Sequence, residues 1–231
     1  MIEETDFETF LYISKNKYQI FVYDKNNLKN LYEAELKIND DINLNFLSKF
    51  LDENIYKIEK MASNFIRDII LIIDNDKILS TNISIKKKNY EKNIDQKYLE
   101  NTLKEIKDIF RESYQDNIIM HMIIINKDDN KNNFLSNNEN KNDDYLYLEV
   151  NFISIPNNFT LNFDRLLKKH QVKIRRYMSG SYIKSFFSKD VTELSVMANK
   201  LNNGLNKNEV QLISKSIENN GFFEKFFQLF S

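Results

Sequence analysis

The chain has 231 residues, and its 33 Lys and Arg against 34 Asp and Glu give a formal net charge of −1. This balance argues against a general nucleic-acid binder, which normally carries a marked basic excess. With no Cys, three Gly and two His, the chain excludes disulfides and thiol chemistry and offers few residues for a Gly-rich phosphate loop or a His-rich metal site.

Three strands and a helix are predicted in the N-terminal part. The strands are an apolar run at Phe10–Ile13, a run of β-forming residues at Tyr18–Tyr23, and an alternating segment at Leu31–Ile38. Ser14–Lys17 forms the turn between the first two. Apolar residues then recur three or four apart over Leu44–Phe65, which predicts an amphipathic helix.

The middle of the chain predicts two strands, a helix, a third strand and a loop. The strands are Ile69–Ile73 and Ile78–Lys86, and a helix capped by Asp95 follows them and runs to about Tyr114. Ile118–Ile125 is almost wholly apolar, as expected for a strand covered on both faces. Residues 126–144 have almost nothing to bury, so we expect a disordered loop there.

The remainder begins with a strand at Tyr145–Ile155, whose apolar residues alternate. A helix from about Thr160 to Lys169, a strand at Val172–Tyr177 and a helix that begins at Ser179-Gly180-Ser181 follow. Short helices are expected after residue 190.

The order of these elements predicts an α/β domain in two pieces. Residues 1–65 and 145–190 form this domain, and a smaller strand–strand–helix–strand subdomain is inserted between them at 66–144. Residues 191–231 form a helical tail that ends in an amphipathic helix at 221–231.

The terminal segment GFFEKFFQLFS separates its apolar and polar residues completely when it is drawn as a helix. We expect the apolar side of this helix to bind a membrane, with structural docking on the protein's own core as the alternative. A helix this short is marginal in water by itself, so it needs an apolar surface to form against. The predicted membrane-binding residues are Phe222, Phe223, Phe226, Phe227, Leu229 and Phe230.

This order of elements resembles the first lobe of an actin-like ATPase, and the position of the insert resembles the bacterial cell-division protein FtsA. FIRDIILIIDNDKILSTNISI at 65–85 resembles the strand pair that opens the family's inserted subdomain, and IIMHMIIIN at 118–126 resembles its closing strand. Residues 147–187 (YLEVNFISIPNNFTLNFDRLLKKHQVKIRRYMSGSYIKSFF) resemble the family's strand, helix, strand and helix start. The resemblance covers about 10–187. It implies an α/β fold that is half of an actin-like (ribonuclease-H-like) fold, with an inserted small α+β subdomain and a helical C-terminal tail.

The chain departs from this family where the nucleotide would bind. The family's first hairpin carries an Asp-Ile-Gly-Thr-type turn, whereas Tyr12–Lys17 (YISKNK) has neither Asp nor Gly. Without Gly the backbone cannot easily approach a phosphate, and the family's second lobe has no counterpart in the residues after 187. We therefore expect no ATPase activity, no catalytic residues, no cofactor and no bound metal. The alternative is a degenerate ATPase that retains weak nucleotide binding.

The resemblance implies a non-catalytic cell-division adaptor, bound peripherally to the cytoplasmic face of the inner membrane and located at mid-cell. Its expected partners are the lipid surface, division proteins, and neighbouring copies bound through the inserted subdomain, but no nucleic acid. The family's site for the FtsZ tail lies in the missing lobe, which argues against FtsZ as a partner. The alternative function is an actin-like platform protein of a pilus or secretion assembly without ATPase activity.

Two weaker features have ordinary structural explanations. His121 lies inside an apolar strand, where a core or edge histidine is expected more often than a ligand. The densest basic cluster fits a helix C-terminus followed by solvated strand positions, and a partner- or membrane-binding patch is its alternative. The cluster consists of Lys168, Lys169, His170, Lys173, Arg175 and Arg176.

Overall fold

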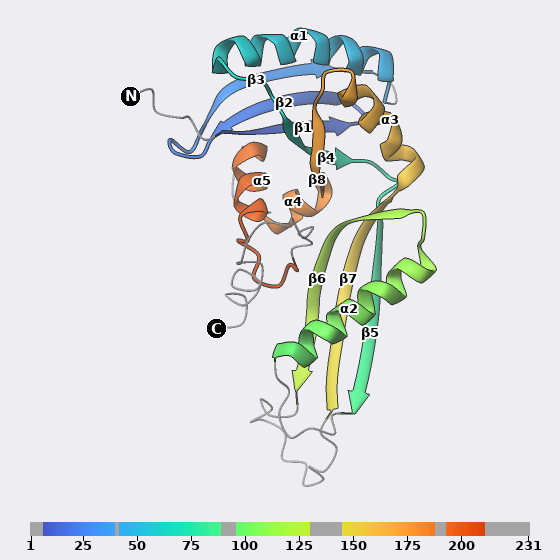
Figure 1. Cartoon of the computed structure of the whole chain (residues 1–231). Coiled ribbons are helices and arrows are strands. Elements are labelled where there is room, and N and C mark those ends of the chain that lie inside the picture. Colours follow the sequence, from blue (N-terminus) through green and yellow to red (C-terminus); the bar gives the residue numbers. More distant parts are fainter. Residues whose placement is uncertain (1–6, 40–41, 89–95, 130–144, 188–192, 211–231) are drawn as a thin grey trace. The chain divides into compact units, whose positions relative to one another are not determined.

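A computed structural model describes residues 7–39, 42–88, 96–129, 145–187 and 193–210 (Figure 1). By its internal contacts the chain divides into two compact units. The first unit comprises residues 1–78 and 155–205, and the second comprises residues 79–154 and 206–231.

The first unit is built around a five-stranded sheet with the strand order β3-β2-β1-β4-β8. β1 pairs antiparallel with β2, and β2 with β3, whereas β4 lies parallel to both β1 and β8. The elements are β1 (Phe7–Ser14), β2 (Lys17–Asp24), β3 (Lys29–Lys37), α1 (Leu44–Ala62), β4 (Asp68–Asp74), α3 (Asn157–Lys168), β8 (Lys173–Ser179), α4 (Gly180–Phe186) and α5 (Leu194–Asn202).

Helices cover both faces of this sheet, with α1 on one side and α4 and α5 on the other (Figure 1). β1 is therefore buried almost along its whole length. Phe10 and Tyr12 belong to the cluster that α4 and α5 cover, while Leu11 and Ile13 alternate with them and are also fully buried. Burying one such aliphatic side chain contributes about 1.5–3 kcal/mol, so both layers contribute to stability.

Local signals set the ends of α1. The Asn43 side chain accepts hydrogen bonds from the backbone N–H groups of Asn45 and Phe46 at 2.9 and 3.3 Å, which satisfies two donors of the first turn. At the other end Ser63 adopts a left-handed conformation with φ of 50°, which stops the helix.

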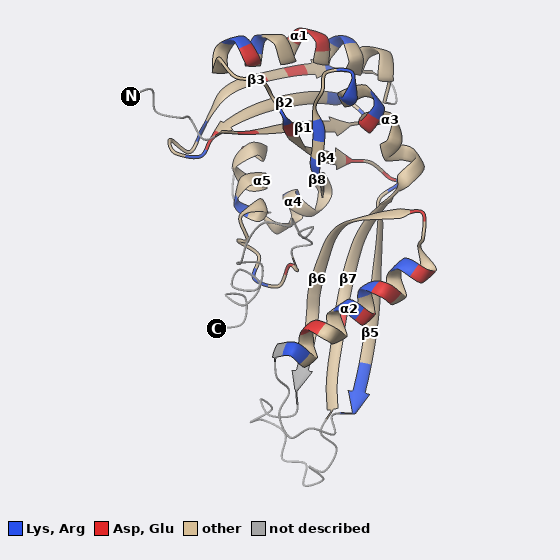
Figure 2. Ribbon diagram, viewed as in Figure 1, with Lys and Arg blue, Asp and Glu red and all other residues tan. Residues whose placement is uncertain are grey.

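The second unit is a three-stranded sheet with the order β5-β7-β6, and α2 covers one of its faces. Its elements are β5 (Leu79–Lys88), α2 (Gln96–Ser113), β6 (Asn117–Asp129) and β7 (Tyr145–Pro156). The apolar side of α2 packs on the strands, and Phe110 stacks on Phe152 of β7 with ring centroids 4.5 Å apart. On the outer side of α2, residues of both charges alternate (Figure 2).

A short segment after α5 returns to this second sheet. Glu209 forms an antiparallel bridge with Ile123 of β6. The Ile124 N–H donates to the Asn208 carbonyl and the Val210 N–H donates to the Met122 carbonyl, both at 2.8 Å. Residues 206–210 therefore extend the sheet at its β6 edge.

Two strands lie in different units from those expected. β4, which we placed in the subdomain at 66–144, belongs to the five-stranded sheet, and β7, which we placed in the α/β domain, pairs with β5. Burial explains both positions. β4 is buried on both faces, as a central parallel strand is, while along most of β7 fully buried residues alternate with partly exposed ones because α2 covers one face of its sheet.

Other expectations differ in extent. β6 continues to Asp129, so the first residues of the expected loop at 126–144 are part of a strand. The rest of that loop, the Asp95 cap and the predicted helix at 221–231 lie outside the described residues.

Candidate functional site

The candidate site is the edge of the first sheet where the parallel strands β1, β4 and β8 end. Ser14 pairs with Asp74, and Ile73 with Ser179, so the three strand ends lie at the same level. In open α/β sheets, ligands bind outside the carboxyl ends of the strands. This edge is therefore the expected position of a bound nucleotide or a reaction centre.

Three side chains meet at this edge. The Tyr12 hydroxyl donates to Oδ2 of Asp74 at 3.0 Å. The Lys184 ammonium on α4 donates to the same carboxylate oxygen at 2.6 Å and to the Tyr12 hydroxyl at 2.8 Å. Partial burial by itself would lower the pKa of Lys184, but the hydrogen bonds with Asp74 and Tyr12 outweigh it and raise that pKa. The Asp74 carboxylate and the Lys184 ammonium group therefore form an ion pair within this cluster.

Gly180 lets α4 approach this cluster closely. A Cβ at this position would lie 3.0 Å from Cβ of Asp74 and 3.1 Å from Cε2 of Tyr12, so a larger side chain would have to displace one of them. The helix begins with its own cap, because Oγ of Ser179 accepts from the Tyr182 N–H at 3.3 Å. The first turn of α4 thus packs against protein side chains.

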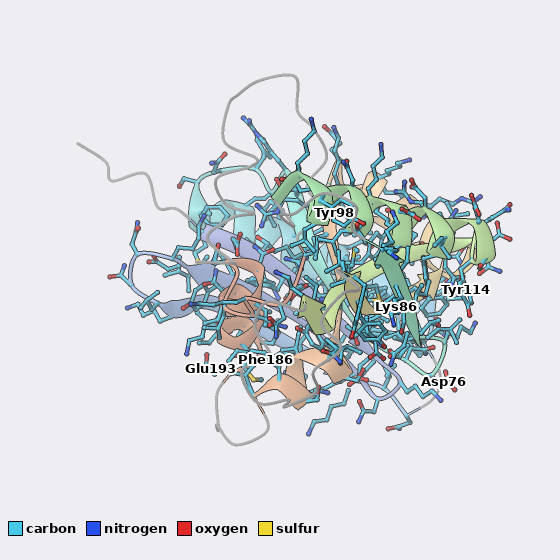
Figure 3. All side chains as sticks on the ribbon, turned by 90° about the horizontal axis from the view of Figure 1, so that it is seen from below. Asp76, Lys86, Tyr98, Tyr114, Phe186 and Glu193 are labelled. Atoms are coloured by element: carbon cyan, nitrogen blue, oxygen red, sulfur yellow. The ribbon has the colours of Figure 1, made fainter. Side chains whose placement is uncertain are left out.

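The β1–β2 turn beside the cluster is closed by its own side chains. Oγ of Ser14 donates to Oδ1 of Asn16 at 2.7 Å and accepts from the Lys17 N–H at 3.2 Å. Lys15 forms an ion pair with Asp76 at 2.9 Å, and this interaction lowers the pKa of Asp76 (labelled in Figure 3). The basic residue at the tip of the turn therefore already has an acidic partner.

The chemistry available at this edge is limited. Asp74 and Asp76, the two carboxylates at the end of β4, each have a lysine partner. Within the described ranges, no group of three or more His, Asp or Glu side chains could hold a metal ion. The arrangement is suited to holding α4 and the β1–β2 turn against the sheet.

A second polar network lies toward the opposite end of β1. The Glu8 carboxylate is only 6% exposed and accepts hydrogen bonds from Arg175 of β8 and from Asn199 and Asn202 of α5. The distances to the two Asn Nδ2 atoms are 3.0 and 3.2 Å. Arg175 also lies 3.6 Å from Asp68. This network joins α5 to the sheet through one buried acidic residue.

The basic cluster near α3 is partly used in structural contacts. Arg175 binds Glu8, Arg176 donates to Oδ1 of Asn202 at 3.1 Å, and His170 lies 3.4 Å from Asp52 of α1. Arg175 and Arg176 thus take part in contacts within the fold, whereas we expected solvated strand positions there.

His121 is a core residue, as expected. Its ring is fully buried, and Nδ1 lies 2.7 Å from Oε1 of Glu209, which is 3% exposed. The contact attaches the segment 206–210 to β6.

The predicted membrane-binding residues lie outside the described residues. They are Phe222, Phe223, Phe226, Phe227, Leu229 and Phe230. None of the helices in the described ranges combines the length and the apolar character needed to cross a bilayer.

Sequence reasoning missed the contacts that form both polar networks, although Arg175 was singled out in the basic cluster. Tyr12 and Asp74 are separated by 62 residues, Asp74 and Lys184 by 110, and Glu8 and Asn199 by 191. No local spacing connects residues so far apart. For Asp74 alone, its position at the end of an apolar strand was an available signal.

Comparison with known proteins identifies the fold. No family model matches the chain, and no curated protein matches it by sequence. Among solved structures, the PilM-PilN type IV pilus biogenesis complex matches with a TM-score of 0.51 and 9% identity, over 78% of this chain and 49% of that chain. The chain therefore has a mixed α/β, actin-like fold, and it spans about half the length of that relative.

Two further structures match over similar lengths. The cytoplasmic domain of EpsL, an inner membrane component of the type II secretion system of Vibrio cholerae, gives a TM-score of 0.38 and 8% identity, over 77% of this chain and 57% of that chain. A Bacteroides thetaiotaomicron protein with an actin-like ATPase fold and unknown function gives 0.32 and 14%, over 80% and 58%. The similarity to the PilM-PilN structure supports the fold and does not point to FtsA in particular.

Proposed function

We propose that this chain is a non-catalytic scaffold of actin-like fold that associates with a membrane and serves as a platform in a pilus or secretion assembly. The observation that carries the proposal is the state of the carboxyl edge of β1, β4 and β8. There Asp74, Tyr12 and Lys184 bind one another, and the turn at Ser14–Lys17 lacks the Gly that a close backbone approach to phosphate favours.

A nucleotide would have to displace these contacts. A phosphate placed at this edge without a metal ion would meet the Asp74 carboxylate, and the ammonium group of Lys184 already bonds to this carboxylate at 2.6 Å. Repulsion by the carboxylate and loss of the ion pair both oppose binding. We therefore propose that the fold functions by presenting binding surfaces and not by binding a nucleotide.

The pilus context comes from the fold relative. The PilM-PilN structure is a pilus biogenesis complex, which favours a platform role over division. A division adaptor of the FtsA type remains the second candidate, since the order of elements resembles that family. A fluorescent fusion distinguishes them: we expect polar or scattered foci, and bands at mid-cell would support division instead.

Titration with Mg-ATP tests the non-catalytic part of the proposal. A ligand present at 100 to 1,000 times its dissociation constant stabilises a protein by about 2.7–4.1 kcal/mol. A micromolar site would thus raise the melting temperature clearly at millimolar Mg-ATP. We expect no such rise and no heat of binding in calorimetry. Micromolar affinity would overturn the proposal.

Membrane association is proposed to depend on the terminal segment at 221–231. Its apolar residues contribute at most about 1.5–3 kcal/mol each if fully buried, and Glu224 and Lys225 cancel in charge. Binding should therefore be moderate and reversible. In liposome co-sedimentation we expect the full chain to pellet and a chain ending at Asn220 to stay in solution.

Point variants provide the matched comparison. Phe223→Ser with Phe226→Ser removes two apolar residues and should abolish pelleting, whereas Gln228→Ser, on the polar side of the same predicted helix, should pellet like the unmodified chain. Equal pelleting of all variants, or of the chain that ends at Asn220, would exclude the segment as the membrane anchor.

A further inference from the structure

The sheet edges of the described structure differ in how well they are protected against pairing with another chain. Unpaired backbone groups along an edge can hydrogen-bond to a strand of another molecule, and charged side chains on the edge normally prevent this. β3, at one edge of the first sheet, carries such charges at Lys29, Glu33, Glu35 and Lys37.

Two other edges are also protected. β8, at the second edge of the first sheet, carries Lys173, Arg175 and Arg176 in its N-terminal half. β6, at one edge of the second sheet, is partly covered by the bridge between Ile123 and Glu209.

β5, the remaining edge, has no such protection over most of its length. From Leu79 to Ile85 (LSTNISI) it has no charged residue, no Pro and no Gly, and basic residues occur only at its end, in Lys86–Lys88 (Figure 2). Among the described residues, β5 pairs only with β7. An edge of seven residues that carries no charge, no Pro and no Gly lacks the usual protection against pairing and can accept a partner strand.

The two faces of β5 suit a partner of the same sequence. Ile83 and Ile85 point toward the cluster under α2 and are only partly buried, and Leu79, on the same face, is 43% exposed. Ser80, Asn82 and Ser84 lie on the other face and are exposed. A neighbouring strand with the same alternation would place its apolar residues beside those of β5 on one face. On the other face it would place its polar residues beside those of β5.

We propose that β5 pairs antiparallel with β5 of a second copy of this chain, centred on Asn82, to form a continuous six-stranded sheet across a two-fold axis. The proposal goes beyond the platform function and does not depend on it.

Side-chain pattern and charge select this arrangement. With Asn82 opposite its own copy, Leu79 faces Ile85, and Lys86–Lys88 of the two chains lie at opposite ends of the ribbon. Parallel pairing would place the two lysine runs side by side, where like charges repel. Centring the pair on Ile83 instead would place Leu79 opposite Lys87, and shifting by one residue would bring apolar residues to the polar face.

The expected association is weak. The pairing buries one short strand and the apolar side chains on one of its faces. The total surface buried should therefore be below about 1,200 Å², at the low end of specific interfaces. Dimers should therefore depend on protein concentration and be favoured where copies are concentrated.

Cysteine cross-linking of the full chain tests both the pairing and its register, because the chain has no Cys of its own. In an antiparallel pair, directly opposite Cβ atoms are about 4.5–5.5 Å apart, close to disulfide geometry. Asn82→Cys should thus form covalent dimers rapidly under mild oxidation. Ser80→Cys is equally exposed but would lie about 13 Å from its copy along the strand, so it should not.

The register gives a second cross-linking result. Ser80 of one copy faces Ser84 of the other, so a mixture of Ser80→Cys and Ser84→Cys chains with tags of different size should give the mixed dimer, while each variant alone should remain monomeric. Equal cross-linking of all the variants, or no cross-linking of Asn82→Cys, would overturn the proposal.

Charge substitutions provide an independent measurement. Asn82→Lys places two ammonium groups opposite each other at the axis, and sedimentation should show dimerisation weakened at least tenfold. Mixing Asn82→Lys with Asn82→Asp should restore it. The matched control is Asn151→Lys on β7, which faces Asn82 within one chain but would lie about 14 Å from its copy across the dimer.

Each result has one interpretation. An unmodified chain that stays monomeric at all concentrations, an Asn82→Lys variant that dimerises normally, or an Asn151→Lys variant that weakens dimerisation as much would refute the pairing. All variants keep the residues at 221–231, so association through that segment would be insensitive to them. The liposome and Mg-ATP experiments can fail while these succeed, and the reverse.

Discussion

The Glu8→Gln variant tests whether one buried carboxylate holds α5 on the first sheet. Glu8 is 6% exposed and accepts hydrogen bonds from Arg175, Asn199 and Asn202. The substitution preserves the size of the side chain and removes its charge. It also turns an NH₂ donor toward groups that are themselves donors.

The magnitude follows from these contacts. A hydrogen bond to a charged group contributes about 1.5–3 kcal/mol and a neutral one about 0.5–1.5 kcal/mol. The side chain of Arg175 is 45% exposed, so water compensates part of its loss. We therefore expect α5 to be destabilised by about 1–2 kcal/mol, which corresponds to a 5- to 30-fold increase in its local opening.

Hydrogen exchange measured by mass spectrometry provides the assay, with peptides covering residues 194–202 compared with peptides covering β1 and β4. Exchange should accelerate 5- to 30-fold in α5 and remain unchanged in the two strands. The exposed ion pair between Lys15 and Asp76 supplies a control, because Asp76→Asn should leave α5 unaffected. An effect below twofold in α5, or an equal acceleration in the strands, would refute the reasoning.

Two further predictions concern a tyrosine and a strand. Burial, together with the Asp164 carboxylate, raises the pKa of Tyr177 above its ordinary value of 10.0, so the fold favours the neutral phenol. The stabilisation that Tyr177 contributes is complete below about pH 10 and decreases as the pH rises above that value. The difference in urea midpoint between the unmodified chain and Tyr177→Phe should therefore narrow between about pH 10 and pH 12, and a constant difference would contradict this prediction. Glu209→Ala removes the buried partner of His121 and should release residues 206–210, so trypsin should cut after Lys207 faster than in the unmodified chain, and an unchanged rate would contradict it.

Much of the fold could be predicted because local patterns were strong. The two long helices follow apolar residues spaced three or four apart, and the strands follow runs of Ile, Leu, Val and Tyr. The order of elements then led to the actin-like fold, which the similarity to the PilM-PilN structure supports.

The division of strands between the two sheets could not be predicted as well. β4 and β7 were recognised as strands, but a strand pattern does not specify its neighbours. The degree of burial is the better guide. A run of five fully buried residues in Ile69–Ile73 is typical of a central strand covered on both faces, whereas alternation in Leu146–Phe152 is typical of a sheet covered on one face.

The candidate site depended on contacts between distant residues. Lys184 and Asp74 each have ordinary local roles, at the end of a short helix and at the end of a strand. Only the parallel pairing of β1, β4 and β8 brings them together. Pairings across more than 60 residues are set by topology, which a single sequence expresses weakly.

The path of the chain after α5 has a mechanical consequence. Residues 206–210 belong to the second unit, where two backbone hydrogen bonds to β6 and the contact between Glu209 and His121 attach them. Any tension applied through the residues beyond 210 therefore reaches β6 first and the five-stranded sheet only afterwards. If the end of the chain is anchored in lipid, the three-stranded unit would bear this tension first. A protein bound to that unit would then experience the tension as well.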